Sequence, residues 1–272
     1  MLVKVAWRNI WRNKLRSVVV ITAIATGLLA GLFASAFVNG MMEQRAHTVI
    51  NTEVSHFQLH HPQFRDKLEA GFFMPEGEEL VAAIATNDSV EAVAGRVVAM
   101  GSVNSARSTG MLNIRGIDPD AEKAVTGLDG KVVEGTYLPT EWTKRSLPIL
   151  ISRKLADKFQ VKLRSKLIFK VMDVNNDIRD GAFKVVGIYD SGNSMYDKAN
   201  VFVRKEHLRK LLQLNEGALH EIAVLLPTHE WAEPMADRYA ATHPELEVLP
   251  YLDLALGMRY ICLLYTSDAA DD

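Results

Sequence analysis

Three neighbouring histidines are the first residues in this sequence that could do chemistry. His56, His60 and His61 lie in a segment with alternating apolar residues. Imidazole is a common zinc ligand, but the ligands must converge on one point. In a strand, His56 and His60 would be about 13 Å apart, and His60 and His61 would point to opposite faces. We therefore expect surface histidines near a loop, and no metal site.

Other motifs for catalysis or cofactor binding are incomplete. The stretch DVNNDIRDG resembles a calcium loop, but Ile178 stands where glycine is needed and Lys184 where glutamate is needed. It is better explained as a polar hairpin turn. The nearest approach to a phosphate loop, TGLDGK, lacks the spacing and the hydroxyl residue after Lys131. There is no G-x-S-x-G motif. The sequence predicts no catalytic residue, no cofactor and no ATP site in this chain.

A cluster of apolar residues, Phe72, Phe73 and Met74, stands in a predicted loop, FFMPEG. Burial between two parts of the fold is the simpler interpretation. Exposed apolar loops also mark binding surfaces, so contact with a lipidated or hydrophobic substrate is the functional alternative.

The segment from Ser17 to Met42 contains no charged residue. As a helix, its 26 residues would extend about 39 Å, enough to cross a hydrocarbon core of about 30 Å. The preceding residues contain no acid, and their five basic residues predict a cytoplasmic N-terminus. These five residues are Lys4, Arg8, Arg12, Lys14 and Arg16. With the net charge at −2, no basic domain is left to suggest nucleic-acid binding.

The first 16 residues also contain two tryptophans in the repeated context WRNIWRNK. Trp7 and Trp11 at helical spacing among basic residues predict an amphipathic helix at the cytoplasmic lipid interface, in contact with membrane lipid. A solvated positive segment is the alternative. The 17–42 segment could itself be a cleaved signal peptide, since Ala34 and Ala36 have the spacing of a cleavage site. Its apolar length exceeds the usual 7 to 15 residues, which favours a permanent transmembrane helix.

The last residues, 262–272, read CLLYTSDAADD and resemble a translated sequencing adapter. On this interpretation Ile261 is the last native residue, and the only cysteine, Cys262, is not part of the protein. Without cysteines, the region after the first span must be stabilised by its own core.

The rest of the sequence predicts an α+β fold. Residues 47–61, 75–88 and 89–103 are expected to form a strand, a helix and a strand, and the same order recurs over 219–252 with Thr228 as a helix cap. We expect these two halves to pair in one sheet. The segment between them, about 103–213, is β-rich and is expected to be an inserted subdomain, with a long hairpin turning near Asn175 and Asn176.

Five stretches together resemble the MacB-type periplasmic core domain of FtsX-like ABC transporter permeases, particularly the lipoprotein-releasing LolC/LolE branch. They are AWRNIWRNKLRS, HFQLHHPQF, MLNIRGIDPDAE, ILISRKLADKFQVKLRSKLIFK and GAFKVVGIYDSGNSMYDKANVFV. The resemblance covers almost all of residues 1–261. It implies that residues 43–255 are a two-part extracytoplasmic domain and that 17–42 is the first of four spans, preceded by residues 1–16. Residues 256–261 would begin the region of the second span.

The resemblance also implies a function. The chain would be a permease subunit in a bacterial inner membrane, with its main domain periplasmic or extracellular. It would form a homodimer or heterodimer with another permease and couple to a separate cytoplasmic ATPase, since only 16 residues precede the span. Lipoprotein or another hydrophobic molecule is the expected substrate. The alternatives are a single-pass anchored binding or scaffold protein and, less well supported, a membrane-tethered hydrolase.

Overall fold

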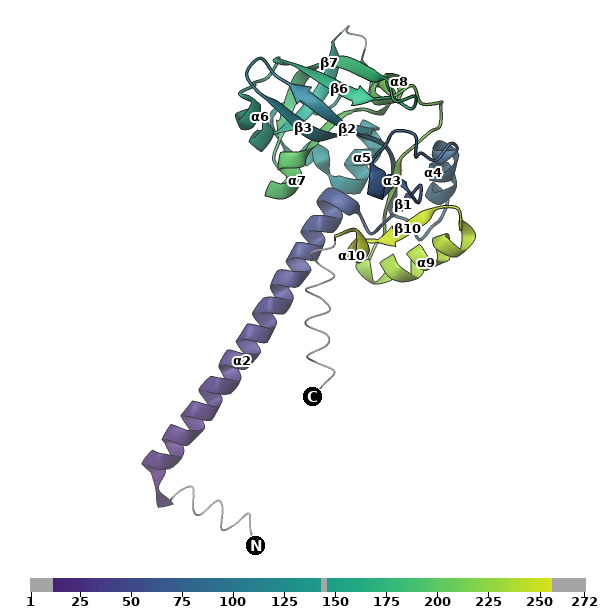
Figure 1. Cartoon of the computed structure of the whole chain (residues 1–272). Coiled ribbons are helices and arrows are strands. Elements are labelled where there is room, and N and C mark those ends of the chain that lie inside the picture. Colours follow the sequence, from purple (N-terminus) through teal and green to yellow (C-terminus); the bar gives the residue numbers. More distant parts are fainter. Residues whose placement is uncertain (1–11, 143–145, 256–272) are drawn as a thin grey trace. The chain divides into compact units, whose positions relative to one another are not determined.

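The computed structural model describes residues 12–142 and 146–255 (Figure 1). The chain divides into two compact units, Met1–His47 and Thr48–Asp272. The structure confirms the predicted α+β class, with an apolar N-terminal helix followed by a mixed α/β domain.

The described part of the first unit is mainly helix α2, Lys14–Val49, whose last two residues belong to the second unit. Residues Lys14–Met41 are long and apolar enough to cross a membrane, with a mean hydropathy of 2.2, and among the described residues no other helix meets that description. Large apolar side chains such as Leu28, Leu32 and Phe33 are exposed along the helix. The hydroxyls of Thr22 and Thr26 donate to backbone carbonyls one turn earlier, which satisfies them inside an apolar segment. Such a helix requires lipid or protein around it.

The segment predicted as a strand from residue 47 is mostly helical. Helix α2 continues to Val49, a π-helical turn, η1, covers Ile50–Val54, and the strand β1 is only Phe57–His60. Val49, Ile50 and Val54 are buried, and this tertiary packing outweighs the β preference of their side chains. Ser55, with φ +58°, ends the helical run and redirects the chain into β1.

The two predicted halves pair in one sheet, in the order β10-β1-β9-β2. Strand β1 lies antiparallel between β10 and β9, and β9 lies antiparallel between β1 and β2. Each half is a β-α-β unit that accepts a strand of the other half, as in ferredoxin-like folds. The elements are α3, Phe64–Lys67; α4, Gly77–Ala85; β2, Ala92–Asn104; β9, Glu221–Leu225; η3, His229–Trp231; α9, Ala232–Thr242; β10, Glu247–Pro250; and α10, Tyr251–Leu254. Thr228 caps η3 and not α9, because the chain makes a 3₁₀ turn before α9 begins.

Strand β2 and five of the remaining strands close into a six-stranded barrel. Its circuit is β2-β3-β8-β5-β7-β6 and back to β2, and β4 adds to β7 from outside this circuit. Each of the six strands therefore has a hydrogen-bonded neighbour on both sides. The strands are β3, Thr109–Ile117; β4, Val132–Gly135; β5, Leu147–Ser152; β6, Lys166–Met172; β7, Ile178–Tyr189; and β8, Asn200–Arg204. The helices are α5, Pro119–Thr126; η2, Leu128–Lys131; α6, Arg153–Phe159; α7, Ser194–Ala199; and α8, Lys205–Leu211.

Strand β2 belongs to both parts of the fold. Its first five residues pair with β9, and from Val97 onward it pairs with β3 and then β6. Apolar residues from both parts form one continuous core, including Phe57, Leu59, Phe169 and Phe183. The boundary of the insertion near residue 103 stays a prediction, because pairing passes through β2 without a break.

The hairpin between β6 and β7 turns where the sequence predicts. Asn176 has a φ of +63°, and the Asp173 carboxylate accepts hydrogen bonds from the backbone N–H groups of Asn175 and Asp177. Arg179 Nε donates to the other Asp173 oxygen at 2.7 Å. The acidic residues of this segment therefore stabilise a polar turn.

Candidate functional site

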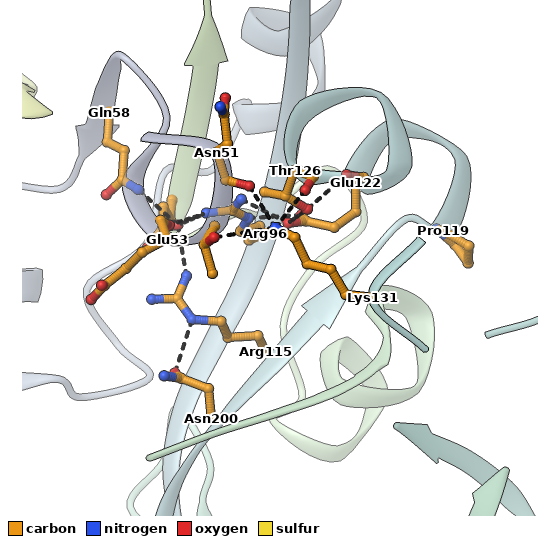
Figure 2. A network of polar contacts seen from close by, with 12 residues as sticks. Asn51, Glu53, Gln58, Arg96, Arg115, Pro119, Glu122, Thr126, Lys131 and Asn200 are labelled. Carbon is orange, nitrogen blue, oxygen red and sulfur yellow. Dashed lines mark hydrogen bonds and ion pairs between the residues drawn. The ribbon is translucent and has the colours of Figure 1, made fainter. Parts of the chain in front are cut away.

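Arg96 is the centre of a buried network of charged residues (Figure 2). It lies in β2 where that strand leaves β9 for β3, and its side chain is fully buried. Its guanidinium contacts both oxygens of Glu122 at 2.8 Å, through Nε and Nη2. Nη1 donates to Glu221 and also to the backbone carbonyl of Glu53, at 3.3 Å. This planar, bidentate arrangement is one that arginine makes and lysine cannot.

Glu221, in β9, receives hydrogen bonds from two arginines. Besides Arg96, Arg115 Nη1 of β3 donates to it at 2.9 Å, and Gln58 Nε2 of β1 donates at 3.3 Å. Burial alone would raise the pKa of the Glu221 carboxyl, but the charges of Arg115 and Arg96 outweigh burial and hold that pKa well below its usual range. Glu221 is therefore an ionised carboxylate that joins three strands.

Glu122 comes from α5, a helix that is not among the elements predicted from the sequence. Its signals were present: Asp118 accepts from the N–H groups of Asp120 and Ala121, Pro119 occupies the first helical position, and Gly127 ends the helix in the left-handed conformation. Thr126 Oγ1 also donates to Glu122, at 3.1 Å. Helix α5 thus places a carboxylate against Arg96.

Lys131 binds the segment that follows α2 directly in the chain. Its ammonium donates to the carbonyl of Asn51 at 2.8 Å, to Thr52 Oγ1 at 3.2 Å and to the carbonyl of Thr126 at 2.8 Å. These contacts satisfy carbonyls at the ends of two helical segments, η1 and α5. Figure 2 shows Lys131 and Arg96 approaching Asn51 and Thr126 in the same region.

The network is suited to holding elements together and not to catalysis. The carboxylates of Glu122 and Glu221 are both engaged by Arg96. In the part of the chain that the structure describes, no three His, Cys, Asp or Glu side chains are grouped to hold a metal ion. Buried charges that compensate each other cost desolvation energy but define one geometry. We therefore interpret the network as a rigid attachment of η1 to β1, β2, β3, β9 and α5.

The predicted site residues have different positions. Lys4, Trp7, Arg8 and Trp11 lie outside the described residues, whereas Arg12, Lys14 and Arg16 are exposed at the start of α2. Phe72 and Phe73 are half-buried, with Phe72 near Lys67 and Phe73 near His220. Met74 is in the core and exchanges backbone hydrogen bonds with Leu219, so its side chain is not open to a substrate.

The expectation of surface histidines is wrong for two of the three. His56 and His60 are buried, because β1 is covered on both faces. His56 Nδ1 accepts from the backbone N–H of Leu226 at 2.9 Å, and His60 Nε2 lies 3.7 Å from Glu221. His61 is half-buried beside Phe72.

A fourth histidine, His220, has a clear protonation state. Its Nδ1 accepts from the backbone N–H of Val98 at 3.1 Å, so its Nε2 carries the proton shared with the carbonyl of Ala70 at 3.2 Å. Burial lowers the pKa of His220 from 6.5 to about 4. The neutral ring therefore connects β9 to the loop before Phe72.

This protonation state predicts acid sensitivity well above pH 4. A pKa that is lower in the folded than in the unfolded state costs stability as pH falls from 6.5 toward 4, and between pH 7 and pH 5 we expect a loss of about 2 kcal/mol. Guanidinium unfolding of the full chain in detergent at the two pH values measures it. The His220→Gln variant keeps one acceptor and one donor but cannot titrate, so its loss should be smaller by that amount. An equal loss in both proteins would contradict the assignment.

Comparisons with known proteins were made on sequence and on structure. No protein-family model matches the sequence, and no curated protein matches it. The structure is similar to the periplasmic region of MacB from Actinobacillus actinomycetemcomitans, with a TM-score of 0.53 and 11% identity over 78% of this chain and 95% of that chain. It also matches the extracellular domain of the noncanonic ABC-type transporter YknZ from Gram-positive bacteria, with a TM-score of 0.48 and 16% identity over 71% of this chain and 98% of that chain. The MacB likeness shows a shared fold.

Proposed function

We propose that the chain is a permease subunit of an ABC transporter. The observation that carries this proposal is the MacB-type fold of the region after α2, combined with an apolar helix of membrane-spanning length directly before it. A folded domain of this kind on a membrane helix can respond to movement of that helix. In this proposal ATP hydrolysis occurs on a separate cytoplasmic subunit, and residues 1–272 themselves contain no phosphate loop.

The buried network gives this proposal a mechanical basis. Chain continuity links α2 to η1, and η1 is held by Lys131 at Asn51 and Thr52 and by Arg96 at the carbonyl of Glu53. A displacement of η1 would therefore act on β2 and α5 together. In this account, ATP-driven movement of the helices in a permease dimer changes the arrangement of the extracytoplasmic domains.

The proposal also includes the class of substrate and the membrane in which the chain is located. We propose release or export of lipoprotein or another hydrophobic substrate, as in the LolC/LolE branch, with Phe72 and Phe73 as half-exposed contacts. The location would be a bacterial inner membrane with a cytoplasmic N-terminus, as the basic residues before the apolar helix favour. Trp7 and Trp11 would anchor the preceding segment at the lipid interface.

The orientation can be tested with a reporter. Alkaline phosphatase fused after Ala255 should be active in cells, because it folds only outside the cytoplasm. Replacing the five basic residues before the span by glutamine removes the cytoplasmic retention signal and should lower that activity. These residues are Lys4, Arg8, Arg12, Lys14 and Arg16. A control variant replaces five lysines far beyond the span and should keep full activity: Lys158, Lys162, Lys166, Lys170 and Lys184. An inactive parent fusion would contradict the orientation.

The subunit assignment is tested by purification from the native membrane. The intact gene, tagged at its N-terminus, should recover an ATPase with a phosphate loop in a fixed stoichiometry. Recovery of the full-length chain without any such ATPase would favour the single-pass anchored scaffold and contradict the permease assignment.

A further inference from the structure

A small polar cavity lies beside the buried network. Its volume is about 240 Å³, below the roughly 300 Å³ at which pockets for drug-sized ligands begin. Its lining comes from several elements of the Thr48–Asp272 unit, including η1, β1, β3 and α10. The residues that matter here are Glu53, Gln58, His60, Arg65 and Arg115. The cavity is therefore large enough for a small polar molecule.

Two arginines that line the cavity have side-chain N–H groups with no hydrogen-bond acceptor among the described residues. Arg65 is half-buried and has no hydrogen bond or ion pair to any described residue. Arg115 uses Nε on Asn200 at 3.1 Å and Nη1 on Glu221 at 2.9 Å, which leaves Nη2 without a described partner. Two guanidinium groups with unused N–H groups fit a carboxylate or a phosphate.

Two other lining residues, Glu53 and Gln58, have oxygen atoms that can accept hydrogen bonds from a ligand. The half-buried carboxylate of Glu53 has one described side-chain partner, the amide of Asn193 at a weak 3.4 Å. Gln58 donates its amide nitrogen to Glu221, which leaves its carbonyl oxygen free among the described residues. Figure 2 shows Glu53, Gln58 and Arg115 reaching toward the same region from η1, β1 and β3. Acceptors beside a poorly paired carboxylate fit an ammonium group.

His60 also lines the cavity, with its Nε2 3.7 Å from a carboxylate oxygen of Glu221. Its Nδ1 is inaccessible to solvent, so this atom faces the interior and not the cavity. The polar groups available to a ligand are therefore those of Arg65, Arg115, Glu53 and Gln58.

We propose that this cavity binds a small zwitterion whose acidic group, a carboxylate or a phosphate, contacts Arg65 and Arg115 and whose ammonium contacts Glu53 and Gln58. A simple anion in the cavity would be repelled by the carboxylates of Glu53 and Glu221, and a simple cation would be repelled by the two arginines. A free amino-acid-like molecule and a phosphoethanolamine lipid headgroup share the required chemistry.

Isothermal titration of the full chain in nanodiscs without phosphatidylethanolamine tests this proposal. The probes are O-phosphoethanolamine and β-alanine as zwitterions. Inorganic phosphate and propionate represent their separate acidic halves, and ethylamine represents the basic half of both. At least one zwitterion should bind about tenfold more tightly than either half, because both ends are held at once. No binding by either zwitterion, or halves that bind equally well, would overturn the proposal.

Substitutions of two lining residues test whether the zwitterion binds in this cavity. Arg65→Gln and Glu53→Gln should each weaken zwitterion binding about tenfold, as expected for loss of one charged contact. Arg107→Gln is the matched control, because Arg107 is exposed and does not line this cavity. Unchanged binding in both cavity variants would overturn the proposal, provided that their unfolding midpoints show folded protein.

A last titration distinguishes a lipid headgroup from a free molecule as the natural ligand. If nanodiscs that contain phosphatidylethanolamine abolish binding of the soluble probe, the headgroup occupies the cavity. If they leave it unchanged, the ligand is a free molecule. None of these titrations needs an ATPase, so their failure would leave the permease proposal untouched.

Discussion

Replacement of Arg96 by leucine is expected to lower the free energy of unfolding by about 3–5 kcal/mol, the range for breaking a buried ion pair by removal of one partner. Arg96 is fully buried and contacts Glu122, Glu221 and the carbonyl of Glu53. Its loss leaves two carboxylates in the interior without their shared cation. The measurement is guanidinium unfolding of the full chain in detergent, followed by the fluorescence of Trp142 and Trp231.

The control for this prediction is Arg107→Leu, an exposed arginine bonded to Gln160, for which we expect a change within about 0.5 kcal/mol. The double variant Arg96→Leu with Glu122→Leu should recover part of the loss, since it removes one of the unpaired carboxylates. A loss below about 1 kcal/mol for Arg96→Leu, or no recovery in the double variant, would show that the network does not fix the fold as described.

Truncation of Phe169 to alanine is the second change with a large expected effect, about 3–5 kcal/mol. Phe169 points into the barrel from β6, fully buried, and its ring packs edge-to-face on Phe183 at 5.1 Å between centroids. Closure of the barrel leaves little freedom to fill the resulting cavity. Ile178→Ala in β7 is the control, because Ile178 is 73% exposed. Equal effects for the two variants would contradict a packed barrel interior.

Local sequence signals predicted several elements well. The helix α4, the strand β2 and the hairpin turn at Asn175 and Asn176 follow from periodicity and turn chemistry, which depend on neighbouring residues. Helix α5 was missed although Asp118, Pro119 and Gly127 mark its ends. A short eight-residue helix with few apolar residues gives a weak periodic signal, so its caps were the better evidence.

Closure of the barrel and the charge network could not be predicted locally. The barrel depends on pairing of β2 with β6 and of β3 with β8, between strands distant in sequence. Arg96 meets Glu221 across 125 residues, and charged residues are rarely expected to be fully buried. For the same reason His60 was expected at the surface, since its burial depends on β1 being an inner strand, between β9 and β10, with both of its faces covered.

The most direct test of the account is whether the extracytoplasmic unit moves when ATP is bound by a partner ATPase. Met195 is 84% exposed, so a spin label can be placed there as Met195→Cys in the intact permease, after its other cysteines have been replaced by serine. Distances between the labels of two permease copies in the purified complex would be compared without nucleotide and with ATP plus vanadate. A shift in the distance distribution is predicted, and it should shrink in Lys131→Met, which loses the contacts to Asn51 and Thr52. The account would be contradicted if the permease that keeps Lys131 gave the same distance distribution without nucleotide and with ATP plus vanadate.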